Sequence, residues 1–242
     1  MADRYFVDEL ICDTSARLVG PEAHHLAHVM RARVGEVVVL FDGSGAEFSA
    51  RIEQVGRAEI QLAVLAREQV DRELPLAITL AVALPKGDRQ RWLVEKATEL
   101  GVAELCPLET EHSGPQSVGA SLERLRRGVI EAAKQCGRNR LMRIGPPMKF
   151  SDLVATALTA GPRWLAHPGG TVLSTAIADT FAVDQPEGIT LAIGPEGGFA
   201  ESEVDCARAA GWQVVGLGRR ILRVETAALA LAAAVASRVD GA

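Results

Sequence analysis

The chain has 242 residues, enough for one large domain or two smaller ones with a buried core. Its composition is that of a globular protein, with 48% hydrophobic and 24% charged residues, and its net charge of −5 is not typical of a nucleic-acid binder. The longest uncharged apolar run, Ala227–Ala236, is too short to span a bilayer, and the first residues lack the apolar stretch of a signal peptide. We therefore expect a cytoplasmic protein without a membrane partner.

Short strands are predicted for most of the first seventy residues. Pro21–Met30 is the exception and reads as a short helix, with proline suited to its first turn. Gly35–Phe41 predicts a strand that ends in the turn Asp42–Gly45, and Ala46–Val55 alternates as its hairpin partner. Ala58–Ala66 supplies another strand. Short strands with glycine-rich turns indicate a small β-barrel.

The pattern changes after Glu68–Pro75, a polar stretch that we interpret as a linker. From there, strands alternate with helices, which predicts a parallel sheet covered on both faces. The expected strands are Ala77–Leu84, Val102–Leu108, Arg163–Ala166, Ile189–Ile193 and Gln213–Leu217. The expected helices are Asp88–Leu100, 121–138, Glu201–Ala210 and Glu225–Val239.

The distribution of charge is more informative than the net charge. Residues 1–73 hold 8 basic and 13 acidic side chains, whereas residues 124–149 hold 8 basic side chains and one acid, Glu131. Such a local excess of cations can bind a phosphate backbone, and it can equally be a solvated helix face. If the segment binds RNA, the candidate contacts are Arg124, Arg126, Arg127, Lys134, Arg138 and Arg140.

The four cysteines carry no sign of a metal site or a disulfide framework. None of them forms a C-x-x-C pair, so reduced, partly buried thiols are the better interpretation, and no metal is expected. They are Cys12, Cys106, Cys136 and Cys206.

Two loops at the carboxyl ends of predicted strands are candidates for the chemistry, because open parallel sheets bind ligands there. Ile193–Phe199 contains three glycines and a proline, which let the backbone turn sharply and approach a ligand closely. It lacks the patterns of a P-loop and of a dinucleotide-binding loop, and a purely structural turn is equally consistent with it. Leu217–Thr226 places three arginines beside Ile221 and Leu222, which fits an apolar pocket with a basic rim.

These two loops together resemble the C-terminal signature of the RsmE methyltransferases, a family of the SPOUT class. The resemblance rests on Gly194–Phe199 followed by Leu217-Gly218 and Ile221-Leu222-Arg223-x-Glu225-Thr226-Ala227. It continues in Lys86–Arg89, in Leu93–Val102, in Glu131–Arg138, in His24-His25-Leu26 and in the Asp42–Gly45 turn, and so spans nearly the whole chain. Four positions depart from the family's pattern, namely His112, Leu125, Met142 and Ala200.

The resemblance implies an α/β protein with a small N-terminal PUA-like β-barrel, an RNA-binding domain, at residues 1–72. It implies a SPOUT methyltransferase domain at residues 73–242, with a trefoil knot near the C-terminus, and a homodimer. The implied reaction is methylation of N3 of a uridine in 16S ribosomal RNA, free or in the assembled small subunit, by S-adenosylmethionine. The expected cofactor-binding residues are His167, Ile193, Gly194, Pro195, Glu196, Gly197, Gly198, Leu217, Gly218, Ile221, Leu222, Arg223 and Thr226.

The chemistry of the acceptor suggests which side chains act in the reaction. Uridine N3 is largely protonated at neutral pH, so the enzyme must favour the deprotonated base. A guanidinium such as Arg223 can do so electrostatically. Glu225 is the second expected catalytic residue, although capping a helix would also explain it, and the sequence leaves the proton acceptor open. A ribose 2′-O-methyltransferase of the same fold and a non-catalytic RNA-binding assembly factor remain as alternatives.

Overall fold

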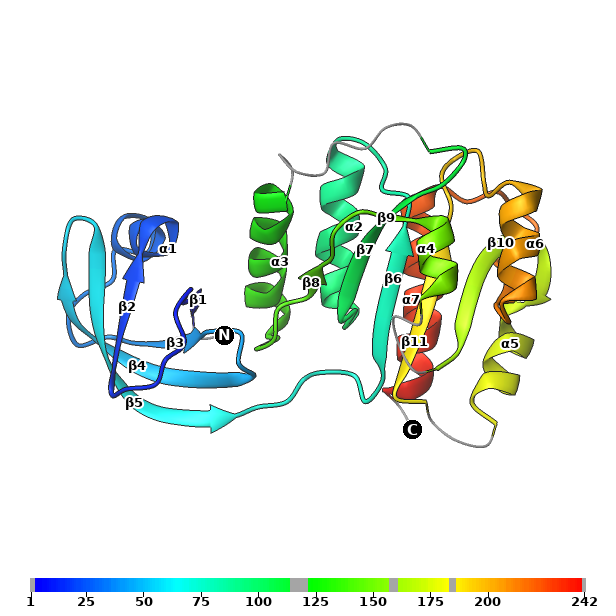
Figure 1. Cartoon of the computed structure of the whole chain (residues 1–242). Coiled ribbons are helices and arrows are strands. Elements are labelled where there is room, and N and C mark those ends of the chain that lie inside the picture. Colours follow the sequence, from blue (N-terminus) through cyan, green and yellow to red (C-terminus); the bar gives the residue numbers. More distant parts are fainter. Residues whose placement is uncertain (1–2, 114–121, 157–160, 183–185, 241–242) are drawn as a thin grey trace. The chain divides into compact units, whose positions relative to one another are not determined.

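The computed structural model describes residues 3–113, 122–156, 161–182 and 186–240 (Figure 1). The chain divides into two compact units. The first comprises Met1–Glu73 with Ile130–Leu141, and the second comprises Leu74–Val129 with Met142–Ala242. The sequence predicted one boundary between residues 72 and 73 and gave no sign that a later segment joins the first unit.

The first unit is built on a five-stranded sheet with the order β1-β3-β4-β5-β2. Only the β1–β3 pair is parallel, and the other pairs are antiparallel. A short helix, α1, continues as one π-helical turn, η1. The bounds are β1 Arg4–Phe6, β2 Ser15–Val19, α1 Gly20–His24, η1 His25–Val29, β3 Val37–Phe41, β4 Ala46–Val55 and β5 Glu59–Gln69. The hairpin between β3 and β4 is the one that the sequence predicted.

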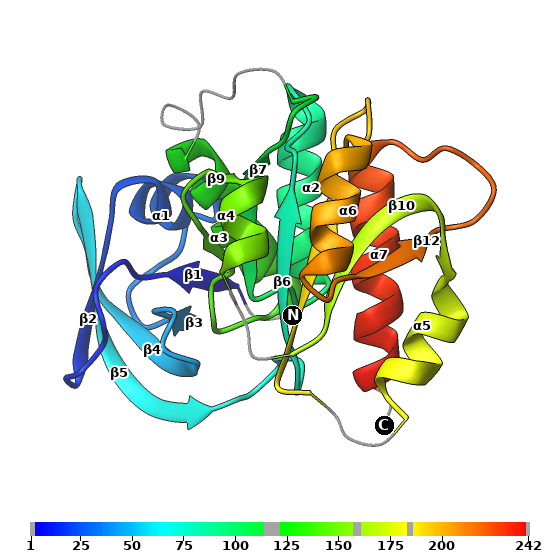
Figure 2. The same cartoon turned by 45° about the vertical axis from the view of Figure 1, so that its right-hand side comes forward.

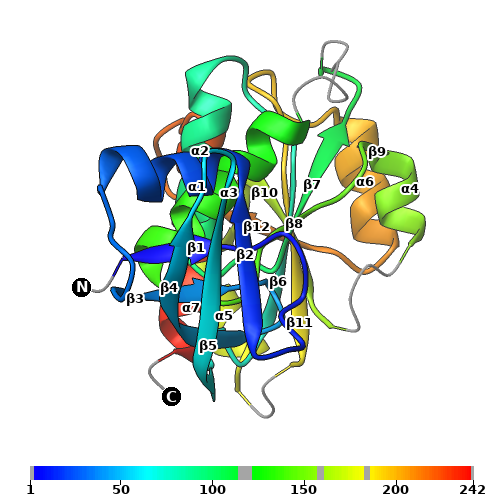
Figure 3. The same cartoon turned by 90° about the vertical axis from the view of Figure 1, so that its left-hand side faces the viewer.

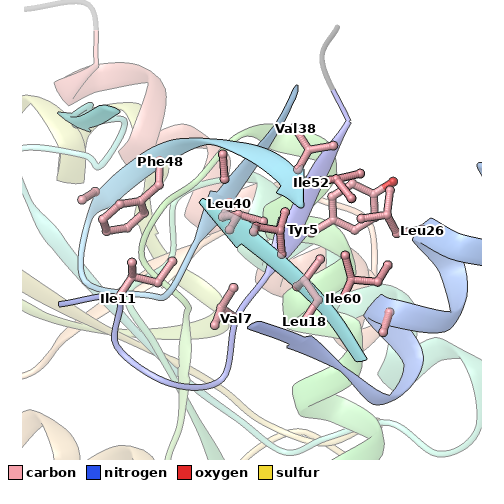
Figure 4. Close-up of a cluster of buried hydrophobic side chains, with 14 residues drawn as sticks. Tyr5, Val7, Ile11, Leu18, Leu26, Val38, Leu40, Phe48, Ile52 and Ile60 are labelled. Carbon is pink, nitrogen blue, oxygen red and sulfur yellow. The ribbon is translucent and has the colours of Figure 1, made fainter. Parts of the chain in front are cut away.

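Alternation along the strands creates the core of this unit. In β4, Ala46, Phe48, Ala50 and Ile52 are buried, whereas the residues between them are not. Their side chains meet those of β1, β2, β3 and β5 and of Leu26 in one apolar cluster (Figure 4). Tyr5 lies within it, and burial, aided by the charges of Asp3 and Glu22, raises its pKa to about 12.

A polar cluster joins residues 137–140 to this barrel-like sheet. Arg4 donates hydrogen bonds to the Glu47 carboxylate at 2.7 Å and to the Asn139 side-chain oxygen at 2.6 Å. Arg72 donates to Glu47 at 3.0 Å and to the Gly137 carbonyl at 2.9 Å. These contacts explain why residues 137–140 belong to the first unit.

The second unit contains a parallel sheet with the order β12-β10-β11-β6-β7-β8, and β9 pairs with a further part of β7. All its strand pairs are parallel. Its strands are β6 Ala77–Val82, β7 Glu104–Glu109, β8 Arg143–Ile144, β9 Met148–Lys149, β10 Arg163–Val172, β11 Gly188–Ile193 and β12 Gln213–Gly216. Its helices are α2 Asp88–Glu99, α4 Phe150–Ala155, α5 Leu173–Thr180, α6 Glu201–Ala209 and α7 Val224–Val239, and α3, Leu122–Cys136, begins in it.

Helices cover both faces of this sheet, as its buried strands require. Figure 3 shows α2 and α7 on one face and α4 and α6 on the other. α7 follows β12 at the edge of the sheet, yet it packs against β6 and β11 in the middle and against α2 (Figure 2). The chain therefore returns across the sheet after its last strand.

Candidate cofactor site

A cavity of about 300 Å³ opens at the carboxyl ends of β10, β11 and β12, three neighbouring parallel strands. This is where open parallel sheets hold ligands, and the volume lies at the lower end of the range for small-molecule sites. Its walls come from a bulge within β10 and from the segments that follow β11 and β12. The lining residues are Ala166, His167, Pro168, Ile193, Gly194, Pro195, Glu196, Gly197, Gly198, Phe199, Leu217, Gly218, Arg220, Ile221, Leu222, Val224 and Ala227.

The first wall is a bulge in β10. Val215 of β12 aligns with both Ala166 and Thr171, so the four residues between them leave the ladder and carry His167 to the cavity. The bulge requires close backbone approach, because a Cβ on Gly170 would lie 2.7 Å from the Val214 carbonyl. Glycine at this position is therefore a condition for the shape of the cavity.

The second wall is the loop from Gly194 to Phe199. Gly198 donates a backbone hydrogen bond to the Pro195 carbonyl at 2.8 Å and has φ of +73°, a turn that favours glycine. The loop is held from outside by two rings. The buried Phe199 packs against Phe150 with 5.0 Å between ring centroids, and the His112 Nδ1 lies 3.2 Å from the Gly198 carbonyl oxygen.

The third wall runs from Leu217 into the first turn of α7. Gly218, with φ of +104°, turns the chain after β12. Ile221 then stands 94% exposed although it lines the cavity, which is unusual for a β-branched apolar residue and typical of a surface that receives a ligand. Arg219, Arg220 and Arg223 are exposed, and none has an acidic partner among the described residues.

The cavity thus brings together most of the residues that the sequence indicated. Eleven of the thirteen expected cofactor-binding residues line it, and Arg223 and Thr226 do not, although residues on either side of Arg223 do. The expected set left out Ala166, Pro168, Val224 and Ala227 as lining residues, and also Arg220 and Phe199. Both stand inside the two motifs, so the motif boundaries were a sufficient signal for them.

Glu225 is not among the lining residues. It is 5% exposed in the first turn of α7, where a carboxylate is favourable next to the helix N-terminus. Its Oε2 lies 3.8 Å from Arg89 Nη1, and the same nitrogen lies 3.4 Å from Oε1 of Glu196 on the second wall. Arg89 was not expected at the site, because a cation in the first turn of α2 has no local signature.

The predicted RNA-binding arginines and lysine fall into two groups. Arg138 is 4% exposed and ion-paired with Glu73, and Lys134 donates a hydrogen bond of 2.9 Å to Glu22. These two side chains hold the first unit together. Arg124, Arg126, Arg127 and Arg140 are the remaining candidates for RNA contact, and Arg127 is exposed with no acidic partner among the described residues.

The four departures from the family's pattern also find a place in the structure. Leu125 and Met142 are buried, and His112 contacts the second wall. At Ala200, the carboxylate of Glu203 accepts the Ala200 N–H at 2.9 Å and the Glu111 N–H at 3.0 Å. Alanine at this N-cap has no side chain to cap α6, and Glu203 partly offsets that lack from inside the helix.

The cysteines show no disulfide. Cys106 is buried, and this burial, together with the nearby Glu104, raises its pKa to about 12, so its thiol is inert. Within the described ranges, no group of three or more potential ligand side chains could hold a metal ion. In the same ranges, no helix is long and apolar enough to cross a membrane.

Comparison with known proteins gives consistent matches. Residues 72–236 match the RNA methyltransferase domain family, and residues 18–65 match the RNA methyltransferase PUA domain family. The ribosomal RNA small subunit methyltransferase E of Synechocystis is 36% identical over 221 residues, which cover 90% of this chain and 72% of that protein.

Solved structures agree with these matches. A putative methyltransferase from Legionella pneumophila, in complex with the bound cofactor S-adenosylmethionine, has a TM-score of 0.87 at 29% identity, covering 98% of both chains. The ribosomal RNA small subunit methyltransferase E of Neisseria gonorrhoeae, bound to S-adenosylmethionine, has a TM-score of 0.83 at 30% identity, again over 98% of both. The expected fold class, a PUA-like N-terminal part and a SPOUT methyltransferase part, is confirmed.

Proposed function

The chain belongs to the RsmE family of RNA methyltransferases, and from this premise we propose that it methylates N3 of a uridine in small-subunit (16S) ribosomal RNA with S-adenosylmethionine. The observation that carries the proposal is the cavity at the ends of β10, β11 and β12, which gathers both signature motifs on one site. The supporting comparison is the pair of similar structures that hold this cofactor.

The residues of the cavity fit S-adenosylmethionine. The two loops offer main-chain N–H and C=O groups that can read the edge of an adenine, and Leu217, Ile221 and Leu222 offer apolar walls. The exposed Ile221 is the clearest sign of this fit, because a bound ligand would cover it. His167 and Glu196 add polar side chains at the rim. When bound, the cofactor supplies an electrophilic methyl group on a sulfonium.

We place the catalytic work of the chain on the arginines beside this cavity. Arg223, exposed at the N-cap of α7, stabilises the negative charge that develops on the uracil carbonyl oxygens as N3 loses its proton. Arg220, which lines the cavity, contributes to binding of the cofactor. Arginine is too basic to accept the proton easily, so its role is electrostatic. Glu225, the other expected catalytic residue, is buried outside the cavity and acts through its neighbour Arg89.

RNA binding is proposed for both units. In the second unit, Arg124, Arg126 and Arg127 follow one stretch of α3, and Arg140 adds a cation in the first. Cations of this kind bind the phosphate backbone regardless of sequence, and they make binding dependent on salt. Lys134 and Arg138 are engaged with carboxylates within the PUA-like unit, so we do not propose them as RNA contacts.

The PUA-like unit offers a second set of cations. Four of its arginines, Arg4, Arg17, Arg51 and Arg72, are ion-paired with carboxylates. Arg31 and Arg33 are exposed after the π-helical turn, and neither has an acidic partner among the described residues. Arg31 also has φ of +54°, a strained backbone that function can explain. These two arginines are the proposed RNA contacts of residues 1–72.

Residues 73–242 are the proposed methyltransferase domain, and the proposed assembly is a homodimer working in the cytoplasm. An observation consistent with a dimer is Trp92 on α2, which is 45% exposed, because exposed tryptophan is enriched at interfaces. Sedimentation of the purified chain tests this assembly directly. A monomer at micromolar concentration would contradict it.

One experiment tests the proposed reaction. The protein is incubated with isotope-labelled S-adenosylmethionine and small ribosomal subunits from cells that lack the enzyme, and the nucleosides are then identified by mass spectrometry. Label in 3-methyluridine is expected. Label in a 2′-O-methyl nucleoside would transfer the protein to the ribose-modifying enzymes. Absence of label despite cofactor binding would favour an assembly factor. Purified 16S ribosomal RNA as the parallel substrate shows whether the assembled subunit is needed.

A further inference from the structure

Arg89 carries its positive charge at the N-terminal end of α2, where the helix dipole disfavours a cation. It is the second residue of α2, which begins at Asp88 after Gly87, and the N-terminal end of a helix carries partial positive charge. A cation there is unfavourable unless an anion lies close by. The structure provides two such anions, and both belong to segments that form the cavity.

The first anion is the carboxylate of Glu225. Its Oε2 is buried and accepts no hydrogen bond from any described residue, which is costly for a charged oxygen. Arg89 Nη1, at 3.8 Å, is the cation that compensates it. Glu225 lies one position from Val224 and two from Ala227, and both of these residues line the third wall.

The second anion is the carboxylate of Glu196, in the middle of the second wall. Its Oε1 lies 3.4 Å from the same nitrogen of Arg89. One guanidinium therefore faces a carboxylate from each of the two loops that carry the signature motifs. Arg89 itself does not line the cavity, so any effect on a ligand passes through these two partners.

We infer that Arg89 is a positioning residue that holds the second and third walls of the cavity at the separation that S-adenosylmethionine requires. This inference rests on the proposed function for the identity of the ligand. Arg89 Nη1 carries two N–H donors in a rigid planar group and can face both carboxylates at once, whereas a lysine ammonium is a compact charge on a flexible stem. Filling the cavity orders both walls, and the ion pairs then contribute to binding.

The two contacts of Arg89 differ in how much they matter for folding. Both contacts exceed the 2.7–2.9 Å of close charge-assisted hydrogen bonds. The side chains of Arg89 and Glu196 are 42% and 60% exposed, so water screens their pair. The Arg89–Glu196 contact therefore adds little to the stability of the chain without ligand, and its loss is expected to appear mainly in cofactor affinity. Loss of the Arg89–Glu225 contact also leaves a buried carboxylate without its cation, which lowers stability.

A double-mutant cycle tests the inference on the full-length protein. The dissociation constant of S-adenosylmethionine is measured by calorimetry for Arg89→Ala, Glu196→Gln and the double variant. We expect Arg89→Ala to lose about tenfold in affinity for S-adenosylmethionine. The double variant should bind the cofactor as tightly as the single variant with the lower affinity, because the effects of coupled residues are not additive. The matched control is Arg91→Ala on the same helix, because Arg91 donates a hydrogen bond of 2.6 Å to Glu95, and the cofactor affinity of this variant should not change.

Arg89→Lys covers the case in which the alanine variant folds poorly. It keeps a positive charge near Glu225, so its unfolding midpoint in urea should match the unmodified protein while its cofactor affinity falls. Equal affinity of Arg89→Ala and the unmodified protein, or strictly additive losses in the cycle, would overturn the inference.

Amide hydrogen exchange without ligand separates this inference from the proposed function. Residues 194–199 and 218–223 should exchange faster in Arg89→Ala than in Arg91→Ala. Unchanged exchange in both loops would overturn the positioning role. If the unmodified protein fails to bind S-adenosylmethionine, the proposed function falls, and the exchange of these two loops still decides what Arg89 does.

Discussion

Glu47 Oε2 accepts a hydrogen bond of 2.7 Å from Arg4 Nη1, and this pair joins β4 to β1 across the strand that lies between them. Both side chains are largely buried. Leaving one member of such a pair without the other is costly, because a buried charge then lacks compensation. Glu47→Gln should therefore lower the unfolding free energy at pH 7 by about 3 kcal/mol, measured by urea denaturation. The control is Glu53→Gln, whose pair with Arg51 is exposed and should contribute less than about 1 kcal/mol.

The same pair predicts that the stability of the protein depends on pH. Burial alone would raise the pKa of Glu47, but hydrogen bonds from Arg72 and Arg4 outweigh it and lower the pKa below the ordinary value of 4.5. Because the folded-state pKa is the lower one, the stabilisation is complete above pH 4.5 and is lost as the pH falls through the folded-state value. The stability difference between the unmodified protein and Glu47→Gln should shrink below pH 4.5. A constant difference down to pH 2.5 would contradict this account.

Substitutions of Arg223 and Arg220 should affect different steps, turnover for Arg223 and cofactor binding for Arg220. Arg223 does not line the cavity, so Arg223→Ala is expected to keep the cofactor affinity within about twofold and to lower kcat by about a hundredfold or more. Arg220→Ala is expected to weaken cofactor binding instead. Arg219→Ala is the control, because Arg219 is exposed and outside the lining. Equal losses of affinity and turnover in Arg223→Ala would contradict its catalytic role.

Gly170→Ala should damage the bulge in β10. The new Cβ would lie 2.7 Å from the Val214 backbone, which cannot move without disturbing β12, and we expect a loss of about 1–3 kcal/mol in unfolding free energy. The matched control is Gly128→Ala in α3, where the nearest atom is an ordinary 3.8 Å away. That change should stabilise the protein by about 0.5–1 kcal/mol, because glycine weakens a helix interior. Thermal unfolding measures both changes: the midpoint should fall in Gly170→Ala and rise in Gly128→Ala.

RNA binding should respond differently to two groups of arginines. Removing Arg124 and Arg127 together should weaken RNA binding and reduce the slope of log K against log salt by about two, since each phosphate contact contributes about one. The unfolding midpoint should not change. Arg138→Ala should instead lower stability, because its guanidinium is buried and ion-paired with Glu73. A salt slope that stays constant in the double variant would exclude this stretch of α3 as a phosphate contact.

Strands and helices long enough to show a regular spacing of apolar residues were predictable from the sequence. The strand expected at Ala46–Val55 has those bounds, because its alternation faces one buried side, and α2 and α7 follow their apolar stripes. The helices α4 and α5 were missed, since six and eight residues are too few to establish a helical period. β1 has three residues and was missed for the same reason.

The site was predictable to the extent that it consists of contiguous loops. Glycines between a strand and a helix indicated where the main chain turns, and most of these residues line the cavity. Contacts between distant segments left no such trace. The Arg138–Glu73 pair joins residues 65 positions apart, and Arg89 meets Glu196 across 107 positions. The expectation of a knot came from the family likeness alone, since general rules of chain connection argue against one.

The construction of the cavity bears on selective inhibition. Four of its seventeen lining residues are glycines, which present only main chain to a ligand, and such a surface is the same whichever side chains surround it. Selectivity for this enzyme must therefore come from the few side chains that project from the walls, above all Arg220, Ile221 and His167. A cofactor analogue with an added apolar group that covers Ile221 and an added anionic group that reaches Arg220 would use both.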